Sequence, residues 1–206
     1  MENVKLRPWV GSLYNSTGLN GRKLMILGES HYCGDCDTCK KINEKCDFTT
    51  WVIENYLLYK NGKVKFAPSM NTFTKFVNVF YGKHCNREII TNFWNSIIFY
   101  NYVQKSLKGP RMSPTNEMFK NSLPAFYEIL KEYNPDIIII WGERLWNNLP
   151  KNGYWSENKI FDEKGGKLYF YNNGKKNIPA YLIYHPSSSY FGYKYSKYLL
   201  ELMKII

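Results

Sequence analysis

With 206 residues, the chain is long enough for one well-packed domain and too short to favour two. Hydrophobic residues make up 44% of it, which excludes a largely disordered chain, and no segment has the roughly 18 consecutive apolar residues of a membrane span. The formal net charge of +11 comes from Lys and Arg residues spread along the chain, and this excess favours a nucleic acid as partner over an acidic membrane surface.

The N-terminus and the cysteines indicate the cellular compartment. The first residues, MENVKLRPWVGSLY, contain no continuous apolar stretch of the kind found in a secretory signal. Five cysteines are present and four of them lie between Cys33 and Cys46, whereas a disulfide framework normally spreads over a small secreted chain. We therefore expect a cytoplasmic, monomeric protein that does not bind a membrane.

Four short apolar runs predict β-strands. In chain order they are Lys23–Leu27, Ile97–Tyr102, Asp136–Trp141 and Ala180–Tyr184. The third, DIIIIW, is the clearest, because a β-branched run that ends at a glycine is typical of a strand buried on both faces of a parallel sheet. Lys167–Tyr171 is predicted to be an edge strand or part of a hairpin.

Helical patterns lie between and around these strands, with apolar residues recurring at helical spacing. The third helix is expected to have its cap at Ser113-Pro114 and to be kinked or divided at Pro124. In chain order, the predicted helices cover Phe48–Leu57, Phe73–Phe80, Thr115–Tyr133 and Tyr195–Ile205.

Strands that alternate with helices predict an α/β fold. We expect three layers, α/β/α, around a central, mainly parallel four-stranded sheet. No internal repeat or low-complexity linker divides the chain. Residues 1–206 are therefore expected to form a single domain with a Cys-rich insertion at about residues 33–46.

Two short segments combine residues that can do chemistry. ILGESHY, at Ile26–Tyr32, directly follows the first predicted strand, and YHPSSSYF, at Tyr184–Phe191, directly follows the last. In open α/β sheets, ligands bind beyond the carboxyl ends of the strands. A glycine-led turn with an acid and a His-Pro-Ser turn are therefore expected to face each other across one cleft.

This pair of motifs resembles the two signature motifs of the uracil-DNA glycosylase superfamily. The order of the segments between them is similar to that of the thermophile-type, iron-sulfur branch: NYVQ at Asn101–Gln104, then Pro110, a helix with Glu117, and NPDIIIIWGERLWNNL at Asn134–Leu149. The resemblance runs from about Lys23 to the C-terminus, and Cys33–Lys63 matches poorly. It implies a monofunctional DNA glycosylase that hydrolyses the N-glycosidic bond of a flipped-out uracil or modified pyrimidine and leaves an abasic site.

The chemistry of that reaction assigns roles to two residues. Breaking the bond develops positive charge on the sugar and negative charge on the departing base. His185 is the candidate that donates to the base oxygen, and Glu29 is the candidate carboxylate that stabilises the sugar and orients the attacking water. In the major bacterial and eukaryotic branch the acid is an Asp one position later, where this chain has Ser30.

The resemblance also implies a pocket for the base and a surface for DNA. Asn101 is expected to read the base through its amide, and Tyr32 is expected to lie against the C5 edge. The second motif, Tyr184–Phe191, called the late motif below, is expected to contact phosphates and to insert a wedge into the base stack. The remaining candidates are Phe66 and Ser30 for the base, Ser187 and Ser189 for phosphates, and Tyr190 and Phe191 for the wedge.

The segment CGDCDTCKKINEKC offers four thiolates within one short loop. Cys33, Cys36, Cys39 and Cys46 suit a structural zinc ion or an iron-sulfur cluster, and free thiols are the alternative. The iron-sulfur branch takes its ligands elsewhere, since no cysteine precedes Gly28 and the later ligand positions are Lys105 and Ser122. No cofactor is expected to be required for catalysis.

Two questions stay open at the level of sequence. Because Ser30 replaces an Asp, the substrate is either uracil or a modified pyrimidine, including the hypermodified cytosines of some bacteriophages, and the latter would imply a role in phage defence. The main alternative from another class is a catalytically inactive member that binds DNA or a protein. A different α/β hydrolase or nucleotide enzyme is disfavoured, because the chain has no phosphate-binding Gly-rich loop and no Gly-x-Ser-x-Gly turn.

Overall fold

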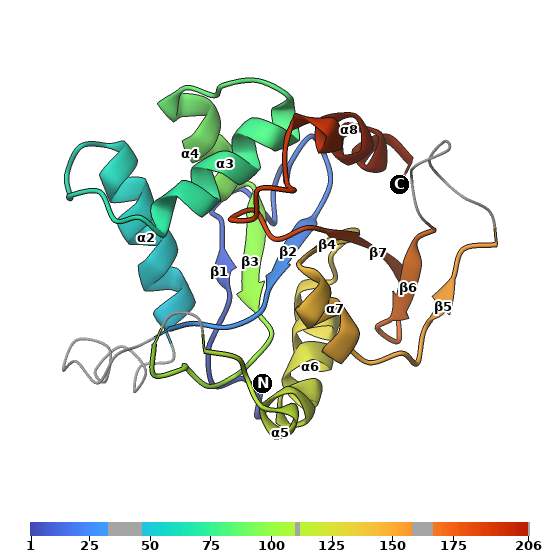
Figure 1. The fold of residues 1–206 in the computed structure, drawn as a ribbon. Coiled ribbons are helices and arrows are strands. Elements are labelled where there is room, and N and C mark those ends of the chain that lie inside the picture. The colour runs from blue at the N-terminus through green and yellow to red at the C-terminus, as the bar shows by residue number, and fades with distance from the viewer. Residues whose placement is uncertain (33–46, 110–111, 158–166, 206) are drawn as a thin grey trace.

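The computed structural model describes residues 1–32, 47–109, 112–157 and 167–205, which form one mixed sheet with helices on both faces (Figure 1). The seven strands lie in the order β1-β3-β2-β4-β7-β6-β5. Their bounds are β1 Trp9–Val10, β2 Leu24–Gly28, β3 Ile97–Asn101, β4 Ile137–Trp141, β5 Tyr154–Trp155, β6 Tyr169–Asn172 and β7 Asn177–Ile183.

The expected α/β class is confirmed, and the sheet is larger than the four strands that were expected. The four neighbours β3, β2, β4 and β7 pair in parallel and correspond to the four predicted strands. Three short strands extend the edges in antiparallel pairing: β1 on β3, β6 on β7, and β5 on β6. β1 and β5 have two residues each, which is too short for a periodic pattern in the sequence.

Alternate residues of the central strands serve two separate cores. Leu24 and Ile26 face one core, and Met25 and Leu27 face the other. The first core is covered by α2 (Phe48–Lys60), α3 (Met70–Tyr81), α4 (Arg87–Asn95) and α8 (Ser196–Ile205). The second is covered by α5 (Asn116–Asn121), α6 (Leu123–Tyr133) and α7 (Glu143–Asn148). A strand buried on both faces has no polar side, which explains why these strands read as continuous apolar runs.

The helix predicted over Thr115–Tyr133 is divided into α5 and α6 at Ser122, two residues before Pro124. Its cap differs from the prediction. The Thr115 hydroxyl, and not Ser113, accepts a hydrogen bond from the Met118 amide at 3.2 Å. The Ser113 hydroxyl instead accepts a hydrogen bond from Arg144.

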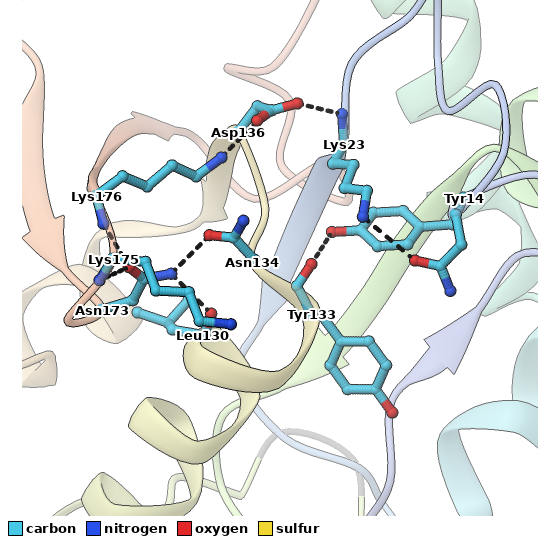
Figure 2. Close-up of polar contacts among 10 residues, drawn as sticks. Tyr14, Lys23, Leu130, Tyr133, Asn134, Asp136, Asn173, Lys175 and Lys176 are labelled. Atoms are coloured by element: carbon cyan, nitrogen blue, oxygen red, sulfur yellow. Dashed lines mark hydrogen bonds and ion pairs between the residues drawn. The ribbon is translucent and has the colours of Figure 1, made fainter.

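Polar contacts fix the amino ends of the strands (Figure 2). The Asp136 carboxylate, directly before β4, accepts hydrogen bonds from the Lys23 amide at 2.8 Å and from the Lys176 ammonium at 2.5 Å. The Tyr14 hydroxyl donates to the Tyr133 carbonyl at 3.0 Å. These contacts tie β2, β4 and the β6–β7 hairpin together at the edge opposite the predicted motifs.

In the described part of the chain, no helix combines the length and the apolar character needed to cross a membrane.

Candidate active site

The predicted motifs meet at the carboxyl edge of the parallel strands. β2 ends at Gly28, whose register partner on β3 is Asn101, and β4 and β7 end at Trp141 and Ile183. Backbone hydrogen bonds continue beyond the sheet, because the amide of Val103 donates to the carbonyl of Glu29 at 2.9 Å. The first motif is therefore held as an extension of β2 and is not a loose loop.

The Glu29 carboxylate is bound by an arginine that follows β4. Arg144 donates from Nε to Oε2 at 2.7 Å and from Nη2 to Oε1 at 2.5 Å, and its Nη1 donates to the Ser113 hydroxyl at 2.7 Å. The Glu29 side chain is only 11% exposed, whereas that of Arg144 is 50% exposed. The hydrogen bond with Glu29 raises the pKa of Arg144 despite partial burial, and Tyr32 adds to the rise. A carboxylate has about four acceptor positions, so two remain for a ligand.

The His185 ring is oriented by its own turn. Nδ1 accepts a hydrogen bond from the Ser187 amide at 3.2 Å and lies 2.7 Å from the Ser187 hydroxyl. Because Nδ1 accepts from the amide, the proton of the neutral ring is assigned to Nε2. Burial lowers the pKa of His185, although the Glu29 carboxylate acts in the opposite direction. The site therefore presents a neutral imidazole with an N–H donor near a carboxylate.

Neighbouring elements keep this turn in place. The Trp141 ring meets the His185 ring edge-on, with 5.8 Å between the centroids. The Ser188 amide donates to the His185 carbonyl at 2.8 Å, and Lys75 of α3 donates to the Ser188 carbonyl at 2.7 Å. Gly142, at φ 98°, adopts a backbone conformation that favours glycine, and α7 begins directly after it.

Asn101 is at the site but is not free. Its Nδ2 lies 3.0 Å from Nε2 and 3.2 Å from Nδ1 of His31, and His31 Nε2 lies 2.8 Å from the Thr49 hydroxyl. A Cβ on Gly28 would collide with the Asn101 amide oxygen, so a larger residue there would have to displace this amide. Asn101 is buried at the carboxyl end of β3, and the side chain that holds its amide, His31, had been left unassigned.

His31 gives the protein a specific dependence of stability on pH. Burial lowers its pKa to about 3, whereas an unfolded histidine titrates near 6.5. Between these values the unfolded chain binds a proton that the folded chain does not bind, so the free energy of unfolding falls as the pH falls. From pH 7 to pH 5 we expect His31 to account for a loss of about 2 kcal/mol.

Urea denaturation at the two pH values tests this expectation. His31→Gln should reduce the loss of stability between pH 7 and pH 5 by about that amount, while His84→Gln, which changes an exposed histidine, should leave it unchanged. The same pH dependence in wild type and His31→Gln would contradict a neutral buried His31.

The other candidates for base binding differ in burial and in their distance from the motifs. The Ser30 hydroxyl is buried and, among the described residues, has no hydrogen-bond partner. Tyr32 is exposed and lies near Arg144, whose pKa it influences. The Phe66 ring packs against the Tyr59 ring of α2, with 5.4 Å between the centroids. Within the described residues, no ring contact or hydrogen bond joins Phe66 to the motifs.

The late motif divides into surface and core residues. Ser187, Ser189 and Tyr190 are exposed, as contacts with DNA require. Phe191 is 1% exposed and stacks against Phe76, with an interplanar angle of 12° and 6.1 Å between centroids. The expectation that Phe191 wedges into DNA is therefore corrected: its ring is part of the core that α3 covers.

The cysteine loop, with Cys33, Cys36, Cys39 and Cys46, lies outside the described residues. Within residues 1–32, 47–109, 112–157 and 167–205, no group of three or more His, Cys, Asp or Glu side chains has an arrangement that would hold a metal ion. Cys85 is buried in the core, and burial raises the pKa of its thiol.

Three residues that hold the candidate site residues or their partners in place had no such role assigned from the sequence: Arg144, His31 and Ser113. Arg144 had a usable signal, since it stands in WGERLW directly after a predicted strand. His31 lies inside the first motif and is one of only three histidines. Ser113 had no signal beyond its predicted role as a cap.

The fold and the site define an α/β protein with a carboxylate, a guanidinium and a neutral imidazole gathered at the carboxyl edge of a parallel sheet. No known protein-family profile matches the chain, and no curated protein resembles it at a significant level.

Proposed function

We propose that the chain is a monofunctional DNA glycosylase of the uracil-DNA glycosylase type, which releases uracil or a modified pyrimidine and leaves an abasic site. The observation that carries the proposal is the placement of Glu29 and a neutral His185 at the same edge of the sheet, near enough for the carboxylate to influence the pKa of the ring. Cleavage of an N-glycosidic bond needs a carboxylate and a hydrogen-bond donor at opposite ends of the breaking bond.

Glu29 is proposed to act at the sugar. As the bond between C1′ and the base nitrogen breaks, positive charge develops on C1′, and a carboxylate with little exposure to water stabilises it strongly. The acceptor positions that Arg144 leaves open can orient a water, whose hydroxyl adds to C1′ while its proton ends on the departing base. Arg144 holds the carboxylate in position, which makes it a positioning residue.

His185 is proposed to act at the base. Its Nε2–H, fixed by the hydrogen bonds at Nδ1, donates to the base oxygen on which negative charge develops. The ring is neutral because burial lowers its pKa, and a neutral imidazole still carries the one N–H that this role requires. The ring need not lose a proton during the reaction.

The base pocket is proposed to include Asn101, Ser30 and Tyr32. The Ser30 hydroxyl lacks a partner among the described residues, so a polar edge of the base would satisfy it. Asn101 would contribute through the part of its amide not engaged by His31. Phe66 is not included, because its ring packs against Tyr59.

Several finer features belong to the same proposal. The parallel strands β3, β2, β4 and β7 would correspond to the four-stranded sheet of the superfamily, with β1, β5 and β6 as additions. DNA would be the partner of a cytoplasmic monomer, bound through Ser187, Ser189 and Tyr190 and through the positive charge of the chain. Activity on modified phage cytosines would place the protein in phage defence.

Base release from a panel of DNAs tests the proposal. The panel contains uracil in single and double strands and phage genomes with modified cytosines, and alkaline cleavage reveals abasic sites. We expect cleavage of at least one member and DNA binding that weakens steeply with salt. Silence across the panel from protein that still binds DNA would instead support the catalytically inactive binding module.

A further inference from the structure

A groove of about 950 Å³ lies beside the candidate active site and has no role in the chemistry described above. It runs along β7 between α7 and β5 on one side and α8 on the other, and Figure 1 shows α7 and α8 on opposite sides of β7. Half of the described residues that line it are aromatic: Trp146, Trp155, Tyr181, Tyr184, Tyr195 and Tyr198.

The groove is continuous with the site along the chain. Tyr184, in its wall, directly precedes His185, and Glu143, also in its wall, directly precedes Arg144. Beyond Tyr184 the aromatic surface continues, because the exposed Tyr190 ring lies 5.6 Å from the Tyr184 ring. A polymer that places one unit between Glu29 and His185 would therefore have this aromatic surface close to its neighbouring units.

Two aromatic rings of the groove, those of Trp155 and Tyr184, are exposed, and Trp155 is supported from behind. Trp155 is 50% exposed, and its ring packs against Trp146 at 5.4 Å and against Tyr169 at 5.3 Å. Lys151 holds Trp146, because its ammonium lies 3.3 Å from the ring centroid and donates to the Trp146 carbonyl at 2.6 Å. Rings fixed in this manner lose little entropy when a flat ligand stacks on them.

The charged side chains of the groove favour a flat ligand that carries negative charge. Among the described residues that line the groove, the charged side chains are Lys167, Lys194 and the carboxylate of Glu143, and the whole chain carries a net charge of +11. Aromatic faces between cationic side chains are the arrangement that binds single-stranded nucleic acids, since the bases stack while the phosphates meet the ammonium groups.

We infer that this groove binds unpaired bases of single-stranded DNA that flank the target nucleotide. The inference rests on the proposed function for the identity of the polymer, but binding in the groove does not require that any base be released. It implies a preference for substrates whose neighbouring bases are unpaired, because a base in a duplex cannot reach the rings of the groove.

Binding of two fluorescent oligonucleotides to the full-length protein tests the inference. One is an oligothymidylate, and the other has the same length and phosphates but carries abasic sugars throughout. We expect the oligothymidylate to bind at least tenfold more tightly. Trp155→Ala should weaken its binding about 5- to 100-fold and leave binding of the abasic oligonucleotide unchanged.

Two further variants make the result specific. Trp155→Phe keeps a ring and should retain most of the affinity, and Trp51→Ala, which removes an exposed tryptophan on α2, should change neither oligonucleotide's binding. Equal binding of the two oligonucleotides, or equal losses in Trp155→Ala, would overturn the inference, because it would show that the phosphates and not stacked bases account for the binding. Because no base release is measured, this result is independent of the glycosylase assay.

Discussion

Replacing Glu29 by glutamine is expected to lower the rate of base release by about 10²- to 10⁴-fold. The amide is nearly isosteric with the carboxylate but cannot neutralise the positive charge that develops on C1′. Because that charge is present only in the transition state, the loss is expected in kcat and not in KM. Single-turnover kinetics on the active member of the DNA panel measure it.

The variant should remain folded, because the Gln amide oxygen can still accept a hydrogen bond from Arg144, whose charge is half exposed to water. Glu132→Gln is the matched control, because it removes an equal charge from an exposed position on α6. DNA binding should persist in Glu29→Gln. Base release at the wild-type rate from this variant would show that Glu29 is not the catalytic carboxylate.

His185→Ala is expected to slow base release by about 10²- to 10³-fold, the usual cost of removing one preorganised donor from a developing anion. The effect should depend on the leaving group. A substituent that lowers the pKa of the departing base reduces the need for a donor, so the variant should lose less activity on such a base. Rates of wild type and variant on two bases of different acidity measure this difference.

His185→Gln provides an intermediate case, because its amide carries an N–H donor and should restore part of the activity. His84→Ala, at an exposed histidine, is the matched control and should behave like wild type. If His185→Ala lost the same factor on both bases, a role in holding the turn through Ser187 would replace the proposed role as donor.

Both predictions concern residues that could be identified from the sequence, because the strands that precede them are visible as local hydrophobic runs. A buried parallel strand needs apolar residues on both faces, so Leu24–Gly28 and Ile137–Trp141 are visible as uninterrupted runs. The residues that follow such runs lie at the carboxyl edge of the sheet. Glu29 and His185 could therefore be assigned to one edge before any coordinates were known.

The edge strands and the exact caps could not be predicted in this way. β1 and β5 are two residues long and acquire their pairing from the neighbouring strand, so their sequences carry no period of their own. Phe191 shows the opposite error: an aromatic residue in a functional motif was taken for a surface wedge, but it packs on Phe76 in the core.

The sequence by itself determined the α/β class, the four parallel strands and the edge at which the motifs meet, because each of these follows from hydrophobic patterns over five to seven neighbouring residues. Only the tertiary structure decided that Arg144 binds Glu29, that His31 holds Asn101, and that aromatic side chains line a groove beside them. Those contacts join residues as many as 115 positions apart, and their geometry depends on how strands and helices pack, which no local pattern encodes.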